Sequence, residues 1–130
     1  TTFGASKKGL WVAVGGATSI ATSPDGLKWT GRGSSIFTVG QGVAWNGKIW
    51  VAVGSGNNTI AYSYDGITWT GLGNTIITIS GNGVAWNGKM WVVVGQGDNT
   101  IAYSYDGINW TGSNSGTAIM TNIGQGVAWT

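Results

Sequence analysis

The chain lacks the side chains on which most enzyme chemistry depends. Its 130 residues include no histidine, no cysteine and no glutamate, so general acid–base catalysis would fall to four aspartates. Without cysteine, no disulfide can form, and no thiolate is present to bind a metal or attack a substrate. We therefore expect no catalytic residues, no metal site and no bound cofactor, and we predict that the protein is not an enzyme.

Charge and long apolar runs are also scarce. Charged residues make up 8% of the chain and the formal net charge is +2, whereas an average protein has about 25% charged residues. Lys7 and Lys8 form the only adjacent basic pair, far from the dense basic stripe that nucleic acids require. No apolar run reaches about 18 residues, so no membrane span is expected. The compartment is left open, and the low charge favours an extracellular or virion surface.

What the chain has in abundance is repetition. The segment Gly42–Lys48 returns as Gly83–Lys89, and its first half returns as Gly126–Trp129, with a period of about 40 residues. Each period also carries a Trp-Val-x-Val-Gly run, an Ile-Ala-x-Ser run, and an Asp-Gly pair followed by Trp-Thr. Short β-branched runs closed by glycine predict strands, and Asp-Gly predicts a hairpin because glycine accepts positive φ.

These runs predict an all-β fold of three four-stranded antiparallel repeats of about 41 residues, most simply the blades of a β-propeller. We name the strands A (Gly-Val-Ala-Trp), B (Trp-Val-x-Val-Gly), C (Ile-Ala-x-Ser) and D (Trp-Thr). The chain is interpreted as one repeat domain, 1–130, with blades near 1–41, 42–82 and 83–123. Segments such as 116–121, between strand D and the next strand A, are expected to be extended crossovers.

The two chain ends differ in a way that suggests how the array closes. Thr2–Ser6 stands where the first strand A belongs but lacks its pattern, while a surplus strand A is expected within 124–130. We predict that 124–130 is a closing strand that completes the first blade, as in propellers closed by a strand from the other terminus. Such closure removes free sheet edges, which otherwise pair with other chains.

The hairpin segments carry a family resemblance. Ser63–Trp69 and Ser104–Trp110 resemble the Asp-box, the Ser-x-Asp-x-Gly-x-Thr-Trp hairpin of sialidase-like β-propellers, and Ser23–Trp29 is a weaker copy. All three are one residue shorter between Asp and Gly, and only the first keeps the Thr. The whole repeat is also similar to the Trp-rich blades of viral and bacterial repeat proteins.

The resemblance implies a fold rather than an activity. It assigns a structural role, capping the turn through backbone N–H groups, to Asp25, Asp65 and Asp106. Sialidase-like chemistry needs an arginine cluster for the carboxylate of its substrate, and Arg32 is the only arginine here. The activity of the family is therefore not expected in this chain.

Three blades are too few for a closed ring, because propellers have about four to eight. Two chains could pair into a six-bladed ring, each lending its last strand to the other, and a homodimer is the oligomer we favour. The chain could otherwise be a piece of a longer propeller. A β-trefoil or β-prism, in which three repeats close within one chain, is the alternative fold.

Two functions fit these features. The first is a non-catalytic structural module that assembles by oligomerisation or strand complementation, on a virion or cell surface. The alternative is a multivalent lectin-like module, because a tryptophan next to an amide suits stacking on and hydrogen bonding to glycans. Packing between blades is the competing explanation for these tryptophans, and a designed repeat protein is a third, weaker interpretation. The candidate ligand-binding residues are Trp45, Asn46, Trp86, Asn87 and Trp129.

Overall fold

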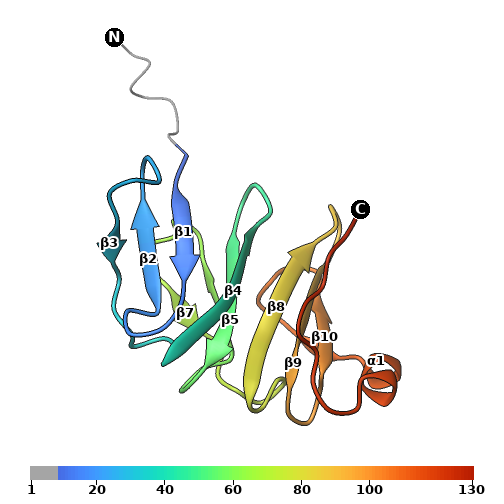
Figure 1. The fold of residues 1–130 in the computed structure, drawn as a ribbon. Coiled ribbons are helices and arrows are strands. Elements are labelled where there is room, and N and C mark those ends of the chain that lie inside the picture. The colour runs from blue at the N-terminus through green and yellow to red at the C-terminus, as the bar shows by residue number, and fades with distance from the viewer. Residues whose placement is uncertain (1–8) are drawn as a thin grey trace.

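The computed structural model describes residues 9–130, so Thr2–Ser6, the expected position of a first strand A, lies outside the described residues. The chain forms three antiparallel sheets that follow one another in sequence and in space (Figure 1). The first sheet has three strands and the other two have four each. This confirms the predicted all-β pattern of repeats, and the array of described residues stays open between its first and third sheets.

Each sheet pairs its strands in chain order. The first sheet contains β1 (Trp11–Val14), β2 (Ile20–Ser23) and β3 (Thr30–Gly31). The second contains β4 (Val39–Trp45), β5 (Trp50–Ser55), β6 (Ile60–Ser63) and β7 (Thr70–Gly71). The third contains β8 (Ser80–Trp86), β9 (Trp91–Gln96), β10 (Ile101–Ser104) and β11 (Thr111–Gly112).

Some elements differ from the expected ones. Strands β4 and β8 begin earlier than the Gly-Val-Ala-Trp run, and each contains a bulge at its paired glycines. Part of the expected crossover 116–121 lies in the short helix α1 (Asn114–Ile119), whose first turn is capped by the Ser113 hydroxyl accepting from Gly116 N–H. The segment 124–130 is not a strand in the single chain. A strand needs a partner backbone, and among residues 9–130 the segment makes one such backbone bond, from Gly124 N–H to Gly95 O, next to the bridge Gln96–Ile123.

The sheets stack face to face, with β4 against β1 and β8 against both β4 and β5. Side chains alternate along a strand, so Val51 and Val53 of β5 pack toward the third sheet while Ala52 packs toward the first. Trp91 of β9 fills the space between the second and third sheets and is fully buried. Burial of a valine such as Val51 or Val53 contributes about 1.5–3 kcal/mol to stability, so the contacts between sheets hold the array together.

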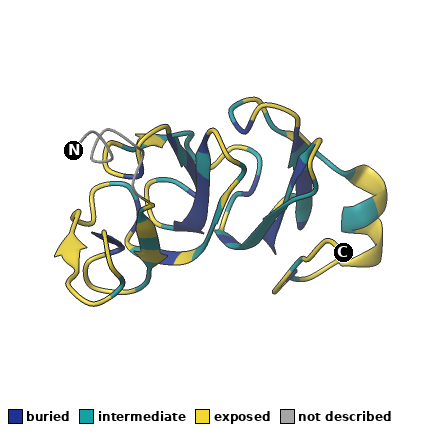
Figure 2. Cartoon of the chain, turned by 90° about the horizontal axis from the view of Figure 1, so that it is seen from above, coloured by how far each residue is buried: buried dark blue, intermediate teal, exposed yellow. Residues whose placement is uncertain are grey.

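Burial is concentrated in the middle of the array, and the two ends are exposed (Figure 2). Within residues 9–130, only the second sheet has a neighbour on both faces. Strand β5 is accordingly buried over most of its length, whereas residues of β1 are exposed or half-buried. Among the described residues, no helix is both long and apolar enough to cross a membrane.

Candidate functional site

The three Asp-box turns are built in the same way. In the second sheet, Asp65 Oδ1 accepts hydrogen bonds from the backbone N–H groups of Ile67 and Thr68, each at 2.8 Å. The Ser63 hydroxyl donates to the same oxygen at 3.0 Å. The equivalent bonds are made by Asp25 and Asp106 in the other two sheets. Each carboxylate therefore holds its own turn closed.

These bonds also stabilise the charged form of each carboxylate. The backbone N–H of Thr68 is the main cause that lowers the pKa of Asp65, and those of Lys28 and Asn109 do the same for the pKa of Asp25 and Asp106. A carboxyl group with a lowered pKa is ionised at neutral pH and is a poor general acid. Within residues 9–130, no three carboxylate, histidine or cysteine groups gather where they could hold a metal ion.

The candidate ligand-binding residues follow strand A in each repeat. Asn46 Oδ1 accepts from the backbone N–H groups of Lys48 at 3.0 Å and Ile49 at 2.8 Å, and Asn87 makes the same turn in the third sheet. Both amide oxygens are therefore occupied by the chain itself. Trp45 and Trp86 pack against the tryptophan at the start of strand B, with ring centroids 5.1 Å apart in both pairs and ring planes tilted by 38° and 51°.

The structure brings only part of this set together. Trp86, Asn87 and Trp129 line one apolar cavity of about 220 Å³, between the third sheet and the C-terminal segment. Trp45 and Asn46 do not take part in it. Trp129 has 64% of its surface exposed, because no strand B stands opposite it in the described chain.

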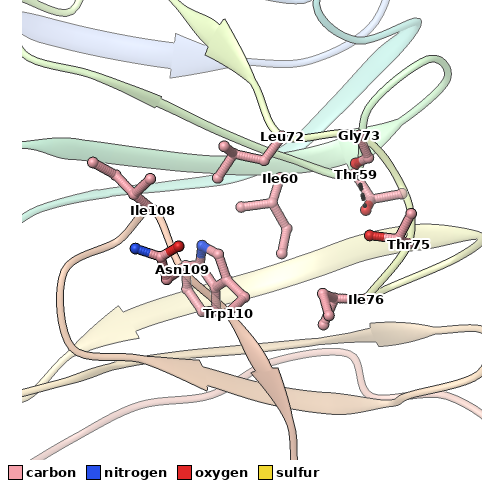
Figure 3. A pocket seen from close by; sticks show the side chains of 9 residues that line it. All are labelled: Thr59, Ile60, Leu72, Gly73, Thr75, Ile76, Ile108, Asn109 and Trp110. Carbon is pink, nitrogen blue, oxygen red and sulfur yellow. Dashed lines mark hydrogen bonds between the residues drawn. The ribbon is translucent and has the colours of Figure 1, made fainter.

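A second hollow, of about 270 Å³, lies between the second and third sheets (Figure 3). Its walls are mainly Ile60, Ile76, Ile108 and Trp110, and none of its lining residues is charged. The Thr59 hydroxyl at its edge already donates to Ile77 O at 2.6 Å. The sequence gives no signal for this hollow, since its residues are scattered over two repeats, and it offers no reactive group.

The outer edge of β1 lacks the neighbouring strand that the equivalent strands of the other two sheets have. In the second and third sheets, strand B is paired on both sides, by strand A and by strand C. Strand β1 is a strand B, and among residues 9–130 it pairs only with β2. Trp11 of β1 is 61% exposed, whereas the equivalent Trp91 is 0% exposed.

The C-terminal segment has the sequence of a strand A, the kind of strand that is absent beside β1. Residues 124–129 repeat residues 40–45 of β4 without a change. Gly124 N–H donates to Gly95 O at 2.8 Å, and Gly40 N–H donates to Gly15 O at the same distance. The segment thus starts against the third sheet as β4 starts against the first.

Comparison with known proteins gives no independent indication of function. No protein-family model matches the chain, and no curated protein and no solved structure is significantly similar to it.

Proposed function

We propose that this protein is a non-catalytic structural module made of β-propeller blades, whose copies assemble into a closed ring. The second and third repeats each form an antiparallel sheet in the order A, B, C, D, and the described part of the first repeat forms a sheet in the order B, C, D. The A strands are neighbours from sheet to sheet, since a methyl group on Gly42 would lie 3.5 Å from Gly83 Cα, and one on Gly83 would lie 3.2 Å from Gly126 Cα. Separate stacked sheets favour a propeller over a trefoil, in which the repeats share one barrel.

The observation that carries the proposal is a pair of identical tetrapeptides with different burial. Trp-Val-Ala-Val forms both β1 and the start of β5. In β5 the Val, Ala and Val are buried, whereas β1 has an exposed Trp and Ala. Large apolar surfaces left uncovered at both ends of an array are typical of protein–protein contacts. The ends expose Trp11, Leu27 and Trp29 on the first sheet, and Ile119, Met120 and Trp129 beyond the third.

A closed ring built from copies of the three described sheets takes two copies. One chain supplies three sheets, and propellers have about four to eight blades, so a multiple of three allows only a six-bladed ring. In this ring the third sheet of each copy faces the first sheet of the other. Every sheet then has a neighbour on both faces, and no outer face is left exposed.

Light scattering after size exclusion tests the proposal. We expect a particle of twice the 13.4 kDa chain mass. Leu27→Asp places a charge in the turn between β2 and β3, at the exposed end of the array, where Leu27 is 83% exposed in the single chain, and we expect it to yield monomers. Ile79→Asp is the matched control, because Ile79 is 57% exposed in the segment before β8 and should leave the dimer intact. A wild-type chain that stays monomeric at high concentration would overturn the proposal.

The lectin-like alternative stays a prediction. Against it, the Asn46 and Asn87 amide oxygens are already hydrogen-bonded within their turns. A glycan array at high protein concentration tests it directly, and binding that is lost in Trp45→Ala would favour it.

A further inference from the structure

We infer that the C-terminal segment 124–130 of one copy is the missing strand A of the first sheet of a second copy. This inference rests on the proposed assembly and specifies which segment pairs with β1, in which register. The first requirement is a free edge, and β1 has one among residues 9–130. The second is a strand of matching sequence without a partner, and residues 124–129 are an unchanged copy of residues 40–45.

The register follows from the two complete sheets. In the second sheet, Trp45 pairs with Trp50, Ala44 with Val51 and Val43 with Ala52, and the third sheet repeats this pattern. Transferred to the open ends, the pattern pairs Trp129 with Trp11 and Val127 with Ala13. Trp11 and Trp129, which are 61% and 64% exposed, would then form the third copy of the tilted tryptophan pair seen in the other two sheets.

The C-terminal segment already has the position of such a strand. A methyl group on Gly124 would meet Val94 Cβ at 2.7 Å, and methyl groups on Gly40 and Gly81 would meet Val14 and Val53 at 2.6 Å. All three glycines therefore fit against the preceding sheet in the same way. The described chain thus places segment 124–130 where the first strand of a further sheet would begin.

The edge of β1 has room for a strand from a second copy. Gly54 and Gly95 end their strand B runs against the backbone of the adjacent strand A, and a methyl group there would overlap the carbonyl oxygen of Val39 or Ser80. Gly15 holds the same position in the first repeat, and a methyl group there meets no heavy atom within 4 Å. The residue equivalent to Val39 and Ser80 is Ile123, so the backbone of Ile123 from the second copy would occupy this space.

The structure disfavours the alternative in which segment 124–130 pairs with β1 of its own chain. In Figure 1, β1 and the C-terminus lie at opposite ends of the array, with the second sheet between them. The segment would have to leave the third sheet, and its bond from Gly124 to Gly95, to reach β1 of the same chain. A second copy brings the strand to β1 without breaking that bond.

Cysteine cross-linking tests both the pairing and its register, because the natural chain contains no cysteine. Directly opposed residues of antiparallel strands have Cα atoms about 4.5–5.5 Å apart, which a disulfide spans. We expect the full chain carrying Ala13→Cys and Val127→Cys to convert under mild oxidation into a species of twice the chain mass on a non-reducing gel. We also expect Ala13→Cys chains to cross-link with Val127→Cys chains when the two are mixed.

Controls make the test specific. Ala13→Cys with Ala128→Cys shifts the pair by one residue and turns the two side chains to opposite faces, so cross-linking should fall by at least about tenfold. Val127→Cys alone should give no cross-link. Covalent monomers, or equal cross-linking of the shifted pair, would overturn the inference. If light scattering shows a dimer and the Ala13–Val127 pair does not cross-link, the assembly stands and the strand pairing is wrong; a monomer by light scattering refutes both.

Discussion

One glycine position tests whether strand A approaches strand B as described. Gly15, Gly54 and Gly95 are equivalent in the three repeats, and none of them has a positive φ. Alanine is therefore permitted by the backbone at all three, and only the space around each residue differs. We predict that Gly54→Ala destabilises the chain and that Gly15→Ala does not.

The magnitude follows from the contacts at Gly54. A methyl group there would overlap the carbonyl oxygen of Val39 and lie 3.0 Å from the ring of Phe37, both on the adjacent segment. Gly54 is buried and paired with Gly40, so the two strands would have to separate. Overpacking in a core costs about 1–3 kcal/mol, and a backbone clash belongs to the upper part of that range because a carbonyl cannot rotate away. We expect a loss of about 2–3 kcal/mol.

Gly15 should behave in the opposite way. A methyl group there meets no heavy atom within 4 Å, and replacing glycine by alanine without strain stabilises a protein by about 0.4–1 kcal/mol through the unfolded chain. In the assembled ring, the same methyl group would meet the backbone of Ile123 from the second copy. Gly15→Ala should therefore leave folding intact and weaken association.

Urea unfolding followed by tryptophan fluorescence separates the two effects when it is repeated over a range of protein concentrations. Stability from association depends on concentration, whereas the intrinsic stability of the chain does not. Gly54→Ala should lower the midpoint at every concentration, and Gly15→Ala should reduce only the dependence on concentration. Equal destabilisation by Gly15→Ala and Gly54→Ala at the lowest concentration would refute the reasoning, because glycine would then be required by strand B itself.

The remaining predictions concern the turns and the C-terminus. Asp65→Ala should lower the free energy of unfolding, measured by urea denaturation, by about 1–2 kcal/mol, since two backbone N–H groups lose their acceptor. The control Asp98→Ala removes a carboxylate outside the Asp-box turns and should change this free energy little. The folded pKa of each Asp-box aspartate lies below its ordinary value of 3.8, so the unfolded chain binds more protons in acid. Stability should therefore hold above about pH 4 and fall as the pH drops through the folded pKa values, and a triple Asp→Asn variant that shows the same fall would contradict this cause. Deleting 126–130 should abolish the dimer and promote aggregation through the free edge of β1; a truncated chain with unchanged mass and melting temperature would exclude a role for the segment in assembly.

The elements that depend on local chemistry were predictable from the sequence. The Asp-Gly pairs predicted the turns because glycine accepts positive φ, and Gly26, Gly66 and Gly107 have φ values of 81°, 79° and 79°. The Trp-Val-x-Val runs gave strands β1, β5 and β9, because β-branched side chains fit a pleated backbone. The hydrogen bonds of Asp65 likewise connect residues within three positions of one another.

Features that depend on neighbouring strands and sheets could not be predicted from the sequence. The early start of β4 at Val39 requires a paired residue, Ser55, on the next strand. The helix α1 replaced an expected extended crossover, because Ser113 caps a turn that the other repeats lack. The hollow in Figure 3 combines side chains from two repeats, and it exists only once the sheets are stacked.

The sequence by itself determined the repeat, the strands and the turns, because these rest on contacts between residues close together in the chain. It could not decide which copy of Trp-Val-Ala-Val is covered, since β1 and the start of β5 are identical in sequence. Only the tertiary structure decides this, because burial is a property of the surrounding sheets. The second sheet lies between two others, and the first sheet has one outer face and one strand edge without a partner among the described residues.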